Sequence, residues 1–130
     1  MSAITEGIAD RVKRYIDKAL KIDDSHTLAN LSKGMWHAEI INQAGKTLAK
    51  VLYGANIKKA RNHFSKAYNS GKKEISILYE LSYGYYLLGE DEDLMLAKKY
   101  LKELSLIATK AHIEKLYKNK AIKLQNKITS

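Results

Sequence analysis

The stretch LYELSYGYY at residues 78–86 repeats the pattern of LANLSKGMW at residues 28–36. Both have leucine at the first and fourth positions, then serine, a glycine two positions later, and an aromatic residue at the end. A glycine inside a helix costs about 1 kcal/mol relative to alanine. Gly34 and Gly84 therefore predict places where a neighbouring helix crosses closely. Repeated helices of this kind indicate stacked units that bury their apolar faces against one another.

A second pattern alternates with the first along the chain. The segments YIDKAL at 15–20, HFSKAY at 63–68 and YLKELS at 100–105 resemble one another. If A denotes the helix type of the first pattern and B that of the second, the order is B, A, B, A, B and a closing helix. This order predicts an all-α fold of antiparallel helix hairpins.

Apolar residues at helical spacing, together with capping residues and glycines, set the expected boundaries. We expect Asp24 or Ser25 to cap the second helix and Asn56 to cap the helix that begins at residue 57. The acids at 90–93 fall in a first helical turn, where they oppose the positive end of the helix dipole and need no calcium. The expected helices cover residues 4–22, 27–44, 57–69, 74–88, 90–108 and 110–128, and a short apolar piece at 46–54 separates the second from the third.

Length and composition favour a single domain over residues 1–130 that stays in solution. The 130 residues contain neither proline nor cysteine, so disulfides and thiolate metal sites are excluded. No apolar run reaches the length of about 18 residues that a membrane span needs. The N-terminus lacks the apolar core of a secretion signal. We therefore expect a soluble, cytoplasmic protein, or a periplasmic one if an export leader has been removed.

The net charge of +9 raises the question of an anionic partner. Only three of the 23 basic residues are arginine, the side chain best suited to bidentate phosphate and base contacts. The lysines are spread at about one per helical turn, which is typical of solvated helix faces. We therefore do not expect nucleic acid as the main partner.

The hairpin order resembles the tetratricopeptide repeat, an antiparallel helix pair of about 34 residues. Leu104 stands where that repeat has a second alanine, and Asp24 where it usually has proline. The resemblance implies a short solenoid with an insertion in its first complete repeat and a closing C-terminal helix. The matching positions are the glycines Gly34 and Gly84, the alanines Ala60, Ala67 and Ala97, and the large apolar residues Phe64 and Leu101.

The inserted region carries a further resemblance. WHAEII, LAKVLYGA and KKARNHFSKAY, in that order, are similar to a bacterial group of small tetratricopeptide-like proteins of unassigned function. They also resemble, more faintly, the repeat domain of the regulator of microtubule dynamics family. Both resemblances imply a helical scaffold for binding, with no reaction and no cofactor attached.

The sequence WHAE at 36–39 is the one segment that looks like a chemical site. Residues two apart on a helix point about 200° away from each other, so His37 and Glu39 cannot share one metal ion or proton. The chain has no HxxxH or HExxH spacing, no phosphate loop and no GxSxG. We expect no catalytic residue and no metal site. Trp36 should pack beneath the inserted segment 48–53, and His37 or Glu39 should hydrogen-bond the irregular backbone around Gly45 and Gly54.

In tetratricopeptide scaffolds the A helices line the concave face. That face would expose eight residues here, unless the closing helix or a second copy covers them: Leu28, Leu31, Ser32, Met35, Leu78, Leu81, Ser82 and Tyr85. The lysine and asparagine positions of the carboxylate clamp in chaperone-binding relatives are absent, so an acidic C-terminal peptide is a poor candidate ligand. The candidate groove residues are Met35, Trp36, His37, Glu39, Tyr53, Ser82 and Tyr85.

Three functional hypotheses follow. The first is a non-catalytic scaffold that binds a protein or peptide, or associates with itself as a homo-oligomer. The second is a groove for a small apolar or lipid-like ligand between the A helices and the inserted segment. The third is weak, salt-sensitive anion or nucleic-acid binding by the Lys-rich C-terminal helix.

Overall fold

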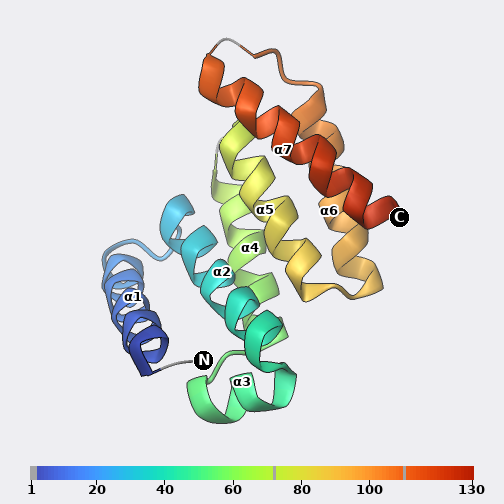
Figure 1. Cartoon of the computed structure of the whole chain (residues 1–130). Helices are drawn as coiled ribbons and strands as arrows, with labels where there is room; N and C mark the ends of the chain where they lie inside the picture. Colours follow the sequence, from blue (N-terminus) through green and yellow to red (C-terminus); the bar gives the residue numbers. More distant parts are fainter. Residues whose placement is uncertain (1–2, 72, 110) are drawn as a thin grey trace. The chain divides into compact units, whose positions relative to one another are not determined.

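The computed structural model describes residues 3–71, 73–109 and 111–130. Within these ranges every regular element is a helix, which confirms the predicted all-α class (Figure 1). The helices are α1 (Ala3–Ile22), α2 (Thr27–Ala44), α3 (Lys46–Tyr53), α4 (Ile57–Ser70), α5 (Ile75–Leu88), α6 (Asp91–Ser105) and α7 (His112–Thr129). No described helix is long and apolar enough to cross a membrane.

Most helix boundaries match the expected ones, and the differences have local causes. The predicted cap Asn56 is confirmed, because its side chain accepts a hydrogen bond from the N–H of Lys59 at 2.8 Å. The predicted cap of α2 is wrong. His26 caps that helix, its Nδ1 accepting from the N–H of Ala29 at 3.1 Å. Ser25 is engaged in the preceding turn, where its N–H and hydroxyl both donate to Asp23.

Two glycines bound the inserted segment, as the sequence predicts, and the structure shows that this segment forms the helix α3. Gly45 has a φ of 84° and Gly54 a φ of 68°, in the left-handed region that side chains with a Cβ rarely adopt. The chain therefore turns sharply out of α2 into α3, and again out of α3 toward α4. Farther along the chain, α6 ends at Ser105 rather than near residue 108, where the sequence places its end.

The contacts divide the chain into two compact units, Met1–Gly71 and Lys72–Ser130. In the first unit α2 is central, and α1, α3 and α4 each pack against it. A Cβ added to Gly34 would lie 2.5 Å from the ring of Phe64. The close crossing predicted at Gly34 is therefore confirmed. The core includes Ile16, Leu31, Trp36, Ile40, Ile41 and Phe64.

In the second unit α5 and α6 form a hairpin, and α7 packs against both. Gly84 is buried within α5. The core of this unit includes Leu78, Leu81, Tyr85, Leu88, Leu101, Leu104, Ala121 and Leu124. Stacking of hairpins into a solenoid, and their union in a single domain, stay predictions.

Candidate functional site

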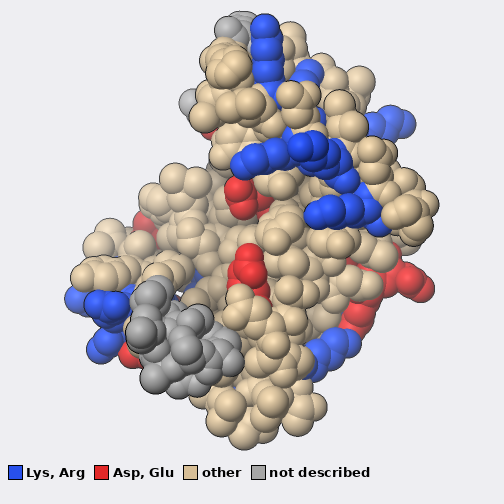
Figure 2. Space-filling model, viewed as in Figure 1, with Lys and Arg blue, Asp and Glu red and all other residues tan. Residues whose placement is uncertain are grey.

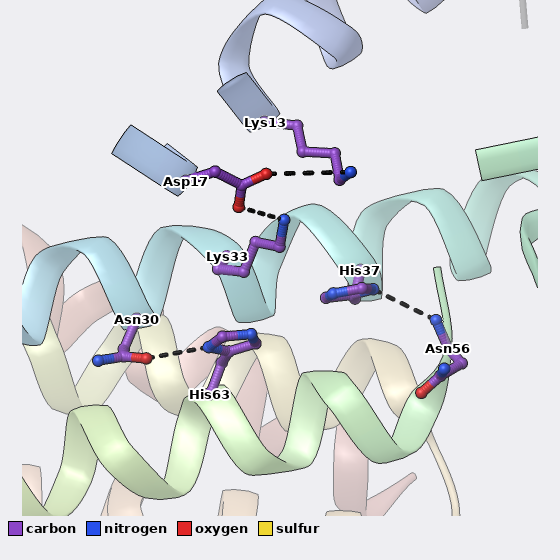
Figure 3. A network of polar contacts seen from close by, with 7 residues as sticks. All are labelled: Lys13, Asp17, Asn30, Lys33, His37, Asn56 and His63. Atoms are coloured by element: carbon purple, nitrogen blue, oxygen red, sulfur yellow. Dashed lines mark hydrogen bonds and ion pairs between the residues drawn. The ribbon is translucent and has the colours of Figure 1, made fainter. Parts of the chain in front are cut away.

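A chain of polar side chains runs along α2, on the sides where α1 and α4 pack (Figure 3). Asn30, Lys33 and His37 of α2 are 0%, 7% and 1% exposed, which is unusual burial for such side chains. Buried polar groups of this kind need hydrogen-bond partners to offset the loss of water. Each of the three has one, described in turn below.

His37 binds the backbone that follows the inserted helix. Its Nδ1 accepts a hydrogen bond from the N–H of Asn56 at 3.2 Å. The prediction that His37 or Glu39 would hydrogen-bond this irregular backbone is thus confirmed for His37. Because Nδ1 accepts, the neutral ring carries its proton on Nε2, which is buried and has no hydrogen-bond partner among the described residues. Burial, and next the charge of Lys33, lower the pKa of His37 from 6.5 to about 3.

His63 of α4 extends the network. Its ring stacks on that of His37, with centroids 6.0 Å apart, and its Nδ1 lies 2.9 Å from Oδ1 of Asn30. The amide nitrogen of Asn30 donates to the carbonyl oxygens of Asp24 and His26 at the start of α2. Burial lowers the pKa of His63 as well, with Lys33 as the next cause. Both rings are therefore neutral near pH 7.

Lys33 joins α2 to α1. Its Nζ lies 2.7 Å from a carboxylate oxygen of Asp17, whose other oxygen is 3.9 Å from Nζ of Lys13. The amines of Lys33 and Lys13 also lie 5.2 and 5.7 Å from the centroid of the Trp36 ring. The buried ammonium of Lys33 is thus paired with Asp17 and lies over an aromatic ring, and both interactions offset its loss of water.

The network is arranged to hold helices together. His37, His63 and Asn30 lie between α2 and α4, and Lys33 and Asp17 connect α2 with α1 (Figure 3). In the described part of the chain no three His, Asp or Glu side chains are grouped so that they could hold a metal ion. Because the groups are buried and engaged with helix neighbours, we interpret the network as structural.

Trp36 is buried, as predicted, with its ring edge-on to that of His37 at a centroid distance of 5.0 Å. Its predicted contact with the inserted segment stays a prediction. The large apolar side chains of α3 are mainly exposed: Leu48 at 54%, Val51 at 73% and Leu52 at 63%. Ala49 is the buried residue of α3, so the packing of α3 against α2 involves the side of α3 that carries Ala49.

The other candidate groove residues have mixed positions. Met35, Glu39 and Tyr53, in the first unit, are partly exposed. Ser82 and Tyr85, in the second unit, are buried; the Ser82 hydroxyl donates to the carbonyl oxygen of Leu78, and the Tyr85 ring packs against Tyr100. Of the expected concave face, Leu31, Leu78, Leu81, Ser82 and Tyr85 are therefore not exposed, whereas Leu28 and Ser32 are.

A groove that the sequence analysis did not identify lies between α6 and α7. It has a volume of about 630 Å³ and is open to solvent. Lys98, Leu101, Lys102, Leu104 and Ser105 line it from α6, and Lys118, Ala121, Ile122, Gln125 and Asn126 from α7. Basic side chains gather along α7 on the face shown in Figure 2. The i, i+4 spacing of Lys98 with Lys102 and of Lys118 with Ile122 was visible in the sequence, but the pairing of the two helices was not.

Comparison of the chain with protein-family models, with curated proteins and with solved structures found no match.

Proposed function

We propose that this chain is a non-catalytic helical interaction module, and that the groove between α6 and α7 binds a segment of a protein partner. One observation carries the proposal: an open groove has buried apolar side chains as its floor and lysines on its rims. Leu101, Leu104 and Ala121 form the floor, and each is at most 6% exposed. An apolar centre with a polar rim is the usual organisation of a protein interface.

The polar groups of the groove suit recognition more than chemistry. The hydroxyl of Ser105 donates to the carbonyl oxygen of Lys102 at 2.6 Å, within its own helix. The amine of Lys118 reaches across from α7 to the carbonyl oxygen of Ser105 at 3.4 Å. No described side chain that lines the groove is a histidine or a carboxylate, the usual general bases.

The scaffold hypothesis allows the partner to be either a different protein or a second copy of this chain. The net charge favours a different protein. The chain carries a net charge of +9, and two copies would approach each other with charges of the same sign. Repulsion of this kind keeps strongly charged proteins apart, most of all at low salt.

A rim substitution with a matched control tests the proposal. Ile122 lines the groove and is 60% exposed, whereas Ile113, on the same helix, is 62% exposed and does not line it. A partner is captured by crosslinking from the source cells and purified, and its Kd for the chain is measured by calorimetry. We expect Ile122→Asp to weaken binding about tenfold, which corresponds to about 1.4 kcal/mol. Ile113→Asp should leave the Kd nearly unchanged.

Equal effects of the two substitutions on the Kd would show that the partner does not use the groove. Capture of no partner, together with turnover of a substrate by the purified chain, would replace the interaction module with an enzyme.

A further inference from the structure

The groove between α6 and α7 also has features that define its occupant, provided that the proposed function holds. We infer that it receives one face of an acidic amphipathic helix, with an apolar stripe of about two turns and carboxylates on both sides of the stripe. The groove's length, its charge and its openness point to this occupant.

The length of the groove corresponds to a short helical segment. Its α7 rim carries Lys118, Ile122 and Asn126, each one helical turn after the last. At a rise of 1.5 Å per residue these positions extend over about 12 Å, or roughly two turns of a helix laid alongside. The α6 rim carries Lys98 and Lys102, again one turn apart. Side chains of the partner at i, i+3, i+4 and i+7 could fill such a groove.

The charge is positive on both rims. Lys98 and Lys102 stand on the α6 side and Lys118 on the α7 side, and none of the described lining residues is acidic. An apolar seam with charges along both edges is the arrangement by which helices select a partner of opposite charge. The carboxylates of the partner should therefore flank its apolar stripe on both sides.

The openness of the groove favours a helix over a single acyl chain. A hydrocarbon tail in an open groove would keep one side in water, whereas an amphipathic helix turns its polar face outward. A single anionic head group would also use cations gathered at one point. Lys98 instead stands one helical turn from Lys102, and Lys118 lies on the other helix, so the cations are spread along the groove.

The two helices that form the groove do not supply the required helix in a second copy of this chain. In α7, Glu114 is the only acid, beside five lysines. In α6 the acids are Asp91, Glu92, Asp93 and Glu103, and the first three fall in its first turn. Neither helix has carboxylates along both sides of an apolar stripe.

Designed peptides test the inference directly on the full chain. The first is a helical peptide with leucines at i, i+3, i+4 and i+7 and glutamates on both flanks. The second has the same composition in scrambled order, and the third has lysines in place of the glutamates. We expect fluorescence anisotropy to show binding of the first, binding at least about tenfold weaker for the scrambled peptide, and none for the lysine peptide.

Charge-reversed variants show whether the rim lysines make the contact. Lys98→Glu with Lys102→Glu should abolish binding of the glutamate peptide and permit binding of the lysine peptide. Lys115→Glu with Lys127→Glu makes the same change in net charge on exposed residues that do not line the groove. That control should change the Kd by less than threefold.

Four results separate the alternatives. Equal loss of binding in the two double variants would overturn the inference, because net charge alone would then explain the attraction. Retention of dodecanoate in native mass spectrometry, in a protein that binds none of the peptides, would assign the groove to a small anionic amphiphile instead. Binding of a short RNA that is abolished by Lys98→Glu with Lys102→Glu but kept in the Lys115→Glu, Lys127→Glu control, with no peptide bound, would assign the groove to nucleic acid. If the captured natural partner depends on Ile122 but the glutamate peptide does not bind, the acidic-helix inference fails and the proposed function stands.

Discussion

His37 of α2 accepts a hydrogen bond through Nδ1 from the backbone N–H of Asn56, at 3.2 Å, across the inserted helix α3. Asn56 in turn caps α4, since its side chain accepts from the N–H of Lys59. One side chain in the middle of α2 therefore fixes the residue at which α4 begins. The segment between Gly45 and Gly54 is therefore inserted without leaving the N–H of Asn56 unpaired.

The bond between His37 and Asn56 should contribute measurably to stability. His37→Leu leaves the N–H of Asn56 without its acceptor, which should reduce the free energy of unfolding by about 1–3 kcal/mol. His37→Asn places an amide oxygen near the position of Nδ1 and should lose less. Urea unfolding followed by circular dichroism measures both. Wild-type midpoints for both variants would show that the bond contributes nothing to the fold.

The same histidine should make stability depend on pH. Burial lowers the pKa of His37 from 6.5 to about 3, so between these values the unfolded chain binds a proton that the folded chain does not. Stability from this group is therefore complete above about pH 6.5 and is lost as the pH falls, by up to about 1.4 kcal/mol per pH unit. The lowered pKa of His63 acts in the same direction.

Unfolding free energies at about pH 7.5 and about pH 5 measure this effect, before most carboxylates titrate. The difference between the two values should be smaller in His37→Asn than in the wild type. His112→Asn removes an exposed histidine and should keep the wild-type difference. If both variants keep it, His37 does not carry the pH dependence.

Local signals in the sequence predicted the helices well. Asn56, Gly45 and Gly54 act at the residues where the sequence places them, because caps and left-handed turns depend on near neighbours. The cap of α2 was missed because serine and aspartate are the usual caps. In the structure Ser25 instead hydrogen-bonds Asp23 within the preceding turn, and the sequence does not reveal this bond. His26 accepts through a ring nitrogen, which composition alone does not suggest.

The sites were less predictable, because they depend on which helices meet. The bond from His37 to the irregular backbone could be predicted, since an insertion leaves amides to be paired. The stacking of His63 on His37 could not, because they belong to different helices. The groove between α6 and α7 was missed for the same reason: a lysine-rich helix looks the same in sequence whether or not it borders an apolar floor.

The crossing of α2 and α4 at Gly34 should tolerate no side chain. Alanine there would gain about 1 kcal/mol in helix propensity. Its Cβ would, however, meet two carbons of the buried Phe64 ring at 2.5 Å, and overpacking of this kind costs about 1–3 kcal/mol. We expect Gly34→Ala to lower the melting temperature, and Phe64→Leu to recover part of the loss when the two are combined.

Gly7 provides the control, since a Cβ added there meets nothing within 4 Å. Gly7→Ala should leave stability unchanged or raise it slightly. A Gly34→Ala variant that melts like Gly7→Ala would mean that the helices can separate enough to admit a methyl group.

Trp36 should contribute strongly to the stability of the first unit. It is 7% exposed, packs edge-on against His37, and lies beneath the amines of Lys13 and Lys33. Trp36→Ala removes this buried surface and leaves a cavity, which should cost about 3–5 kcal/mol. Tyr15→Ala is the matched control, because Tyr15 is an aromatic residue of α1 that is 73% exposed, and its loss should change stability by about 0.5 kcal/mol or less.

Thermal melts of the two variants, together with measurements of peptide or partner binding, show whether Trp36 serves in packing or in recognition of a partner. If Trp36→Ala melts like Tyr15→Ala but no longer binds a partner, Trp36 belongs to a binding site and the structural interpretation of WHAE is wrong.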